Sequence, residues 1–334
     1  MKRLIILLPL VLLLLGCAGA DVSAEKQPQA VPETAPTETM SVTVPETQPL
    51  PKPTEEVTEP PETVPIPVSI ILEPQAPGIQ EERCADAVVD YSNAADGYIM
   101  VRYLAQTDRR LKVLLKGPST TYNYNLPQDQ WSVFPLSDGD GSYQAGVYIN
   151  VDGNKYATVM TAHFDVALTD EFAPFLRPNQ YVNYVDAPDT MALGAELCAD
   201  LADPLDKVAA VYDFVVENLT YDEEKAATVK SGYLPQLDEV LAAKKGICFD
   251  YAALMTAMLR SQEVPCKLVV GYAGSIYHSW ISVWTEENGW IDGIIFFDGH
   301  VWKRMDPTFA SSAEDMEQIL EYIEHGNYTA KYLY

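Results

Sequence analysis

The pattern of apolar and polar positions predicts a region of short strands in the first half of the folded chain. Between residues 97 and 168, runs rich in aromatic and β-branched residues alternate with turns that contain glycine, proline or aspartate. The runs predict strands at 97–104, 111–115, 120–124, 142–149 and 156–168. Short strands separated by turns at this spacing are typical of an antiparallel β-sandwich.

Helical spacing replaces the strand pattern in the second half. Over residues 205–219 the apolar positions recur every three or four residues and form one stripe. Asp203 can cap this helix, and Pro204 fits its first position. A second helix is indicated over residues 235–244, where the lysines and Gly246 are natural helix endings.

A third helix is predicted to begin at Cys248. Ala252, Met255 and Leu259 follow it at helical spacing, and most other positions are also apolar. We therefore expect the central buried helix of the domain. A thiol at the first position of a helix lies near unsatisfied N–H groups and the positive end of the dipole, which favour the nucleophilic thiolate. The alternative is that Cys248 is a small buried hydrophobic residue.

A histidine and an aspartate follow at positions that suit acyl-transfer chemistry. His278 lies near the start of an aromatic, β-branched strand that follows the buried strand 266–272, and Asp306 ends a later strand region. Cysteine, histidine and aspartate can supply the nucleophile, the base and the orienting carboxylate. If the His278 strand pairs directly with residues 301–306, Asp306 comes within reach; Asp292 is the alternative carboxylate.

Four motifs around these residues resemble the transglutaminase-like superfamily of papain-like cysteine enzymes. In chain order they are Gly246-x-Cys248-x-x-x-Ala252, Gly271-Tyr272, His278-x-Trp280 and Asp306-Pro307-Thr308. The resemblance covers roughly residues 196–334. It implies an α+β fold over residues 191–334, in which a central helix packs on an antiparallel sheet. Residues 84–190 resemble the Ig-like β-sandwich that precedes this module in bacterial surface lipoproteins.

The first 17 residues have the pattern of a targeting segment. Lys2 and Arg3 precede an apolar run over residues 4–15, which is too short for a comfortable membrane span. The run ends in Leu14-Leu15-Gly16-Cys17, which resembles a bacterial lipobox. The resemblance implies lipidation of Cys17 and a membrane-anchored protein that faces the extracytoplasmic side. An uncleaved N-terminal anchor would also leave the rest of the chain outside the cytoplasm.

Residues 18–83 are predicted to be a disordered tether. They are rich in proline, threonine and glutamate, and Val31-Pro32-Glu33-Thr34 recurs at residues 44–47. Such a composition cannot bury a core. The whole chain of 334 residues has a formal net charge of −26, which disfavours nucleic acid as a partner because phosphate binding requires clustered lysine and arginine.

We expect different roles for the other cysteines. Cys84 and Cys198 flank the β region and could form a disulfide outside the cytoplasm, although spacing alone does not establish it. Cys266, inside a strand, is expected in the core. Cysteine and histidine spacings give no zinc pattern, and we expect neither a metal nor an organic cofactor.

These predictions favour a cysteine enzyme that acts on peptide or protein amides through a thioester acyl-enzyme. The backbone N–H of Cys248 is a natural oxyanion donor, and Tyr221 is a weaker candidate for a second one. The acyl group would pass to water or to an amine, and the sequence does not decide between hydrolysis and transamidation. Cell-wall peptides are among the candidate substrates. The alternative is a surface binding or adhesion protein that uses the same fold without turnover.

Overall fold

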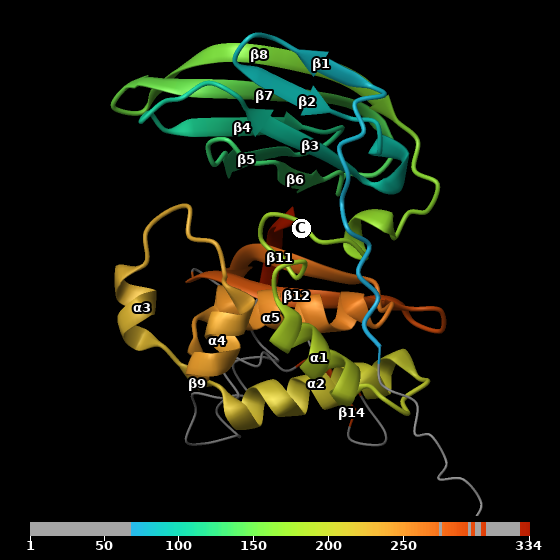
Figure 1. Cartoon of the computed structure of the whole chain (residues 1–334). Helices are drawn as coiled ribbons and strands as arrows, with labels where there is room; N and C mark the ends of the chain where they lie inside the picture. Colours follow the sequence, from blue (N-terminus) through green and yellow to red (C-terminus); the bar gives the residue numbers. More distant parts are fainter. Residues whose placement is uncertain (1–67, 274–275, 293–294, 298–301, 305–327) are drawn as a thin grey trace, which may run out of the picture. The chain divides into compact units, whose positions relative to one another are not determined.

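The computed structural model describes residues 68–273, 276–292, 295–297, 302–304 and 328–334. Cys17, most of the predicted tether and Asp306 lie outside the described residues. Two antiparallel sheets come first in the chain, and a mixed region of helices and strands follows (Figure 1). None of the helices in the described ranges is long and apolar enough to cross a membrane.

The first region contains two four-stranded sheets. One has the strand order β1-β2-β3-β6, with bounds Glu81–Arg83, Ala87–Asp90, Tyr98–Tyr103 and Ser132–Pro135. The other has the order β5-β4-β7-β8, with bounds Thr121–Asn125, Leu111–Lys116, Gly141–Asp152 and Lys155–Val166. The chain passes from one sheet to the other after β3, after β5 and after β6. All five predicted strands are confirmed, as β3, β4, β5, β7 and β8.

Alternation along the strands explains how this region forms its core. On β4, Leu111, Val113 and Leu115 are buried, while the intervening residues are half-buried or exposed. One face of the sheet therefore packs inward and the other remains accessible. Strands β1, β2 and β6 were not predicted because each has only three or four residues, and β2 is buried at every position and shows no alternation.

In the second region, the residues that the structure describes form five helices and a four-stranded antiparallel sheet. The helices α1 to α5 span Pro188–Leu197, Pro204–Asn218, Glu223–Thr228, Leu237–Ala243 and Cys248–Ser261. The sheet has the order β13-β12-β11-β16, with bounds Gly289–Asp292, Ile276–Thr285, Cys266–Ala273 and Tyr328–Leu333. Two short pairs complete it: β9 (Thr220–Tyr221) with β10 (Lys245–Gly246), and β14 (Ile295–Phe297) with β15 (Trp302–Arg304).

The predicted helices are confirmed as α2, α4 and α5. Asp203 caps α2, since its carboxylate accepts from the Leu205 N–H at 2.8 Å. Helix α4 ends one residue earlier than its glycine signal indicates, because Lys244 adopts the left-handed conformation with φ of 50° and Gly246 belongs to β10. Helix α1 was not predicted. Its N-cap residue is Ala187, whose methyl side chain cannot accept a capping hydrogen bond.

Helix α5 is the centre of this region. Every residue from Asp250 to Ser261 is buried. The helix packs on β11 and β12 and also contacts α1, α2 and α4 (Figure 1). The prediction of a central buried helix is therefore confirmed.

Arg260 near the end of α5 joins three separate segments. Its guanidinium is almost completely buried, and its nitrogens donate to the carbonyl oxygens of Cys266 at 2.8 Å, Arg177 at 2.7 Å and Tyr334 at 2.6 Å. Burial lowers the pKa of Arg260 from its ordinary value. The three carbonyl dipoles compensate for the desolvation of the charge, so Arg260 fixes β11, the segment before α1 and the last strand to the helix.

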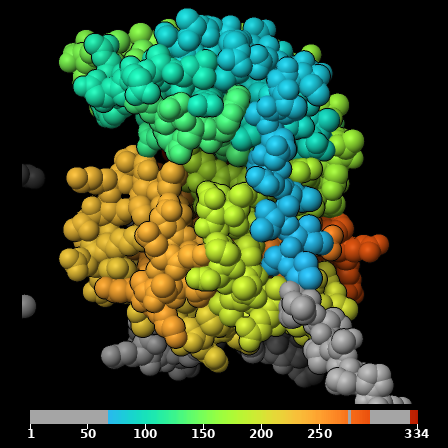
Figure 2. Space-filling model, in the orientation of Figure 1, coloured from blue at the N-terminus to red at the C-terminus, as the bar shows by residue number. Residues whose placement is uncertain are grey.

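Residues 68–80 form an extended strap over the surface (Figure 2, blue). At one end the Ser69 hydroxyl donates to the Met191 carbonyl at 2.7 Å, and the Ile70 N–H donates to the Ser261 carbonyl at 2.8 Å. At the other end the Gly78 N–H donates to the carboxylate of Asp90 at 2.6 Å. The strap therefore ties the helices α1 and α5 to the first sheet.

Candidate active site

Cys248 is positioned by the strand pair that precedes α5. The Thr220 N–H donates to the Lys244 carbonyl at 3.0 Å, and the Asp222 N–H donates to the Gly246 carbonyl at 2.8 Å. This parallel pair fixes the chain up to Ile247, which is the N-cap residue of α5. Cys248 is the first helical residue, as predicted, and its side chain is partly exposed.

Asp250 anchors the start of the same helix. Its carboxylate is fully buried and accepts from the Ile247 N–H at 2.9 Å, the Tyr233 hydroxyl at 2.6 Å and the Lys225 ammonium at 2.6 Å. A carboxylate at the third position of a helix satisfies an N–H group that has no partner within the helix. Asp250 therefore fixes the turn that carries Cys248 and also attaches the segment 223–236 to it.

His278 lies on β12, the strand next to β11 in the sheet. It pairs in register with Gly271, and its ring stacks on Trp280 with the centroids 6.4 Å apart. A side chain at position 271 would overlap the Thr329 carbonyl and the Trp280 ring, which explains the glycine there. His278 is only 5% exposed. The predicted strand around the histidine is confirmed.

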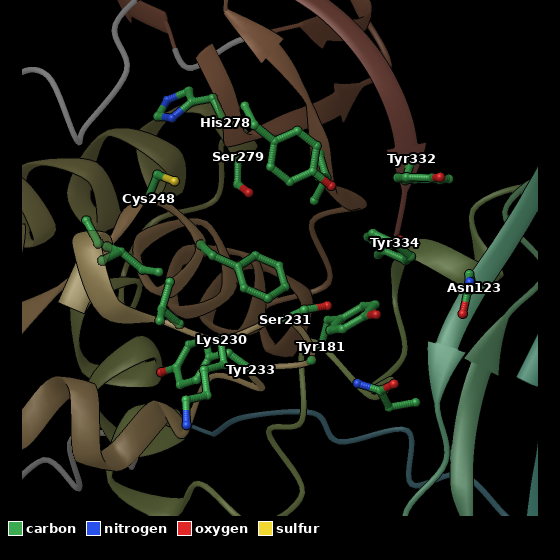
Figure 3. A pocket seen from close by; sticks show the side chains of 18 of the residues that line it. Asn123, Tyr181, Lys230, Ser231, Tyr233, Cys248, His278, Ser279, Tyr332 and Tyr334 are labelled. Atoms are coloured by element: carbon green, nitrogen blue, oxygen red, sulfur yellow. The ribbon is translucent and has the colours of Figure 1, made fainter. Parts of the chain in front are cut away.

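Cys248 and His278 line one cavity of about 520 Å³. Figure 3 shows both side chains on one side of the cavity and Asn123 of β5 on the other. Aromatic side chains form much of the wall, and they are Tyr181, Tyr221, Tyr233, Phe249, Tyr277, Tyr332 and Tyr334. The strands of the first region contribute Lys112, Asn123 and Asn125. The cavity therefore belongs to both regions of the described chain.

Burial affects the acidity of several tyrosine hydroxyls that line the cavity. Burial raises the pKa of Tyr181 to about 12 and raises the pKa of Tyr334 further. The pKa of Tyr277 is raised mainly by burial and also by Tyr332, Tyr272 and Cys248. The hydroxyls of Tyr181, Tyr277 and Tyr334 therefore stay protonated at neutral pH and can donate hydrogen bonds to a ligand.

The third member of the predicted triad is not assigned by the described structure. Asp306 lies outside the described residues. Trp302–Arg304 pair with Ile295–Phe297, so the predicted direct pairing of this stretch with the His278 strand is wrong for the described residues. The alternative carboxylate, Asp292, accepts from Ser282 at 2.5 Å. Ser282, the partner of Asp292, is four residues from His278, which is roughly 13 Å along the strand. Asp292 is therefore too far away to orient the imidazole.

The remaining predicted site residues have the following positions. Tyr221 lies on β9 and lines the cavity. Cys84 and Cys198 are both free thiols, so the structure does not contain the disulfide that the sequence allowed. Cys266 is buried in β11, as expected. In the described ranges, no three histidine, cysteine or acidic side chains lie close enough together to hold a metal ion.

The features that the sequence reasoning missed are Asp250 and the cavity wall from the first region. Asp250 falls two residues after Cys248, where an aspartate can be a helix-start signal. Its partners Lys225 and Tyr233 follow no helical or strand periodicity. Lys112 precedes Cys248 by more than 130 positions in the chain, so the sequence contains no local signal that would bring them together.

A central helix on an antiparallel sheet, with a cysteine at the helix start and a histidine on the sheet, makes the second region a mixed α/β domain. Residues 192–292 match the family model described as the transglutaminase-like superfamily. This part of the chain is therefore similar to the transglutaminase-like superfamily. The match includes Cys248, Asp250 and His278.

Two curated relatives match part of the chain. YebA of Bacillus subtilis, described as an uncharacterized protein, is 31% identical over 32% of this chain and 18% of its own length. A protein-glutamine gamma-glutamyltransferase of Pseudomonas aeruginosa is 29% identical over 40% of this chain and 20% of its own length. The chain thus spans about a fifth of the length of these relatives.

Among solved structures, the chain is similar to the crystal structure of red sea bream transglutaminase. The sequence identity is 14%, the TM-score is 0.29, and the match covers 65% of this chain and 48% of the other.

Proposed function

We propose that this protein is an extracytoplasmic, lipid-anchored cysteine enzyme that acts on peptide or protein amides through a thioester. The observation that supports this most directly is that Cys248 and His278 line the same cavity, with the thiol at the start of α5. The helix start supplies N–H groups and a positive partial charge that favour the thiolate. The histidine supplies a base from the neighbouring sheet.

The reaction has two steps. The Cys248 sulfur attacks the carbonyl carbon of the amide while His278 takes the thiol proton. The carbon–nitrogen bond then breaks, His278 gives the proton to the departing amine, and the acyl group remains on sulfur as a thioester. Water or a second amine attacks the thioester, His278 accepts its proton, and that proton returns to the departing sulfur.

Three further groups complete the proposed chemistry. The Cys248 N–H would donate to the oxyanion of each tetrahedral intermediate, because it is the first N–H of the helix. Tyr221, which lines the cavity, is the second candidate donor. Asp306 is proposed as the carboxylate that orients His278, on the resemblance of Asp306-Pro307-Thr308 to the family motif. Both hydrolysis and transfer to an amine are compatible with this site, and the name of the Pseudomonas relative supports the second.

The location and the N-terminal region are part of the same proposal. Leu14-Leu15-Gly16-Cys17 supports lipidation at Cys17 and anchorage on the outer side of a membrane, with cell-wall peptides as candidate substrates. We expect Cys17→Ser to move the protein from the membrane fraction to the soluble fraction, and an unchanged distribution would contradict the anchor. The two sheets β1-β2-β3-β6 and β5-β4-β7-β8, with crossovers between them, support an Ig-like sandwich.

The pH dependence of iodoacetamide alkylation tests the cysteine and histidine pair. The rate at Cys248 is measured by peptide mass spectrometry from pH 5 to 10 in the wild type and in His278→Ala. Cys84 is a matched internal control, because it is a free, partly exposed thiol outside the cavity. We expect Cys248 to react at lower pH than Cys84 in the wild type and to lose this advantage in the variant.

Two outcomes would refute the catalytic proposal. The first is an alkylation profile of Cys248 that follows Cys84 in both proteins, since the thiol would then have no activating partner. The second is turnover of a peptide amide that survives Cys248→Ala. The non-catalytic binding protein would then be the better account of the fold.

A further inference from the structure

The cavity contains cations and no described carboxylate, although the protein is strongly acidic. Over the whole chain, 48 acidic residues stand against 22 lysines and arginines. Among the described residues that line the cavity there are two lysines, Lys112 and Lys230, and neither aspartate nor glutamate. Asp250 lies behind the wall, where Lys225 neutralises it. The described lining of the cavity is therefore cationic, opposite in sign to the net charge of the protein.

Lys112 is placed by the first region of the chain. It lies on β4, directly opposite Asn125 on β5, and residues opposite each other in an antiparallel pair share a face of the sheet. Lys112 is half-buried, and burial together with the charge of Arg110 lowers its pKa from the ordinary value. Within the described part of the chain, no carboxylate forms an ion pair with Lys112. Its ammonium is thus partly desolvated and uncompensated.

Lys230 reaches the same cavity from the segment between α3 and α4. This segment touches the first region at Gly232, where φ is 90° and a Cβ atom would overlap the Asn125 side chain. Asn125 thus contacts Lys112 on its own sheet and Gly232 on the segment that carries Lys230. Lys230 is exposed and, in the described ranges, also has no ion pair. The lining of the cavity therefore includes one lysine from the first region and one from the segment between α3 and α4, and within the described residues neither has an ion pair.

We propose that Lys112 and Lys230 bind a carboxylate of the substrate, so that the enzyme acts on peptides that are anionic near the amide that reacts. This inference rests on the function proposed above. It makes the N-terminal sheets part of the specificity site. Asn123, Asn125 and the tyrosines of the same lining provide neutral hydrogen-bonding groups in the cavity. The carboxylate is either a glutamate or aspartate side chain or the free α-carboxylate at the end of a peptide.

The experiment compares matched peptides on the full chain. One pair differs only in glutamate against glutamine beside the reacting amide, and the other differs only in a free against an amidated C-terminus. In at least one pair, we expect kcat/KM to be about tenfold higher for the peptide that has the carboxylate. One charge-assisted hydrogen bond stabilises a complex by about this factor. Whichever pair shows the preference identifies the source of the carboxylate. Equal kcat/KM in both pairs would overturn the proposal.

Variants assign the preference to the lysines. Lys112→Gln and Lys230→Gln should each reduce it several-fold, while Lys116→Gln should leave it unchanged. Lys116 is the matched control because it lies on the same strand and the same face as Lys112 but does not line the cavity. Thermal unfolding of each variant establishes that the fold is retained. A preference that survives both cavity variants, or that falls equally in Lys116→Gln, would refute the assignment.

A binding measurement separates this inference from the proposed reaction. In Cys248→Ala, fluorescence anisotropy gives the Kd of the same peptides, labelled at the N-terminus, at low and high salt. Tighter binding of the carboxylate peptides at low salt, without turnover in the wild type, would support the anion site and refute the reaction. Turnover of neutral and anionic peptides at equal rates would support the reaction and refute the anion site. Equal or undetectable binding of both members would also count against the anion site.

Discussion

The ion pair between Lys225 and Asp250 gives the sharpest prediction about stability. The Lys225 side chain is 26% exposed, whereas the Asp250 side chain is completely buried, and the two charged atoms are 2.6 Å apart. Removal of either partner breaks the pair, but the charges left behind have different access to water. Lys225 can turn toward solvent, and Asp250 cannot. The two single substitutions should therefore have unequal effects.

We expect Lys225→Met to lower the free energy of unfolding by about 3 kcal/mol. This is the lower end of the range for a broken buried pair, because the Tyr233 hydroxyl and the Ile247 N–H still donate to Asp250. Asp250→Asn should cost about 1–2 kcal/mol, since the amide keeps the shape and part of the hydrogen bonding. The double variant should cost no more than Asp250→Asn alone, because it contains no uncompensated buried charge.

Urea unfolding of the wild type, the two single variants and the double variant measures this coupling. Lys230→Met is the control, because Lys230 lies in the same segment, is exposed and has no ion pair within the described ranges; its effect should be below about 0.5 kcal/mol. If the losses of the single variants add in the double variant, the two charges do not depend on each other. The argument from unequal burial would then be wrong.

Two further predictions concern a buried arginine and a half-buried lysine. Arg260→Met should lower the free energy of unfolding by about 3 kcal/mol in the same urea assay, because three main-chain carbonyl oxygens lose their donors; exposed Arg109→Met is the control, and an equal effect of the two would contradict this role. Burial, partly offset by Asp292 and Glu171, lowers the pKa of Lys267 from 10.5 to about 8. Between these values the unfolded chain binds more protons than the folded one, so the stability of the wild type relative to Lys267→Met should rise from pH 8 to 10.5, and a constant difference would contradict the shift.

Periodicity predicted the elements that carry the candidate nucleophile and base. The apolar stripe of residues 205–219 became α2, and the spacing from Cys248 became α5. The prediction of α2 succeeded because a helix that buries one face repeats its apolar residues every three to four positions. The prediction of α5 succeeded because a helix that is buried on all sides is apolar at most positions. The strand around His278 succeeded for the corresponding reason, since β-branched and aromatic residues fit a pleated surface.

The environment of the site could not be predicted in the same way. The carboxylate of Asp250 accepts hydrogen bonds from Lys225 and Tyr233. These two residues lie in a segment without helical or strand periodicity, and they come close to Asp250 only in the folded chain. Lys112 reaches the cavity because Asn125 packs on Gly232, a contact between residues more than 100 positions apart. Such pairings depend on tertiary packing. A single sequence carries no local signal for them.

The strap formed by residues 68–80 determines where a mechanical load would enter the protein. The chain leaves toward the predicted tether at Ser69 and Ile70, whose partners are Met191 and Ser261. Ser261 is the last residue of α5 and Cys248 is the first, so the length of the helix, roughly 20 Å, separates them. A pull on the N-terminus would strain these hydrogen bonds before it reached the thiol. The attachment point can therefore give way under tension while the geometry around Cys248 is preserved.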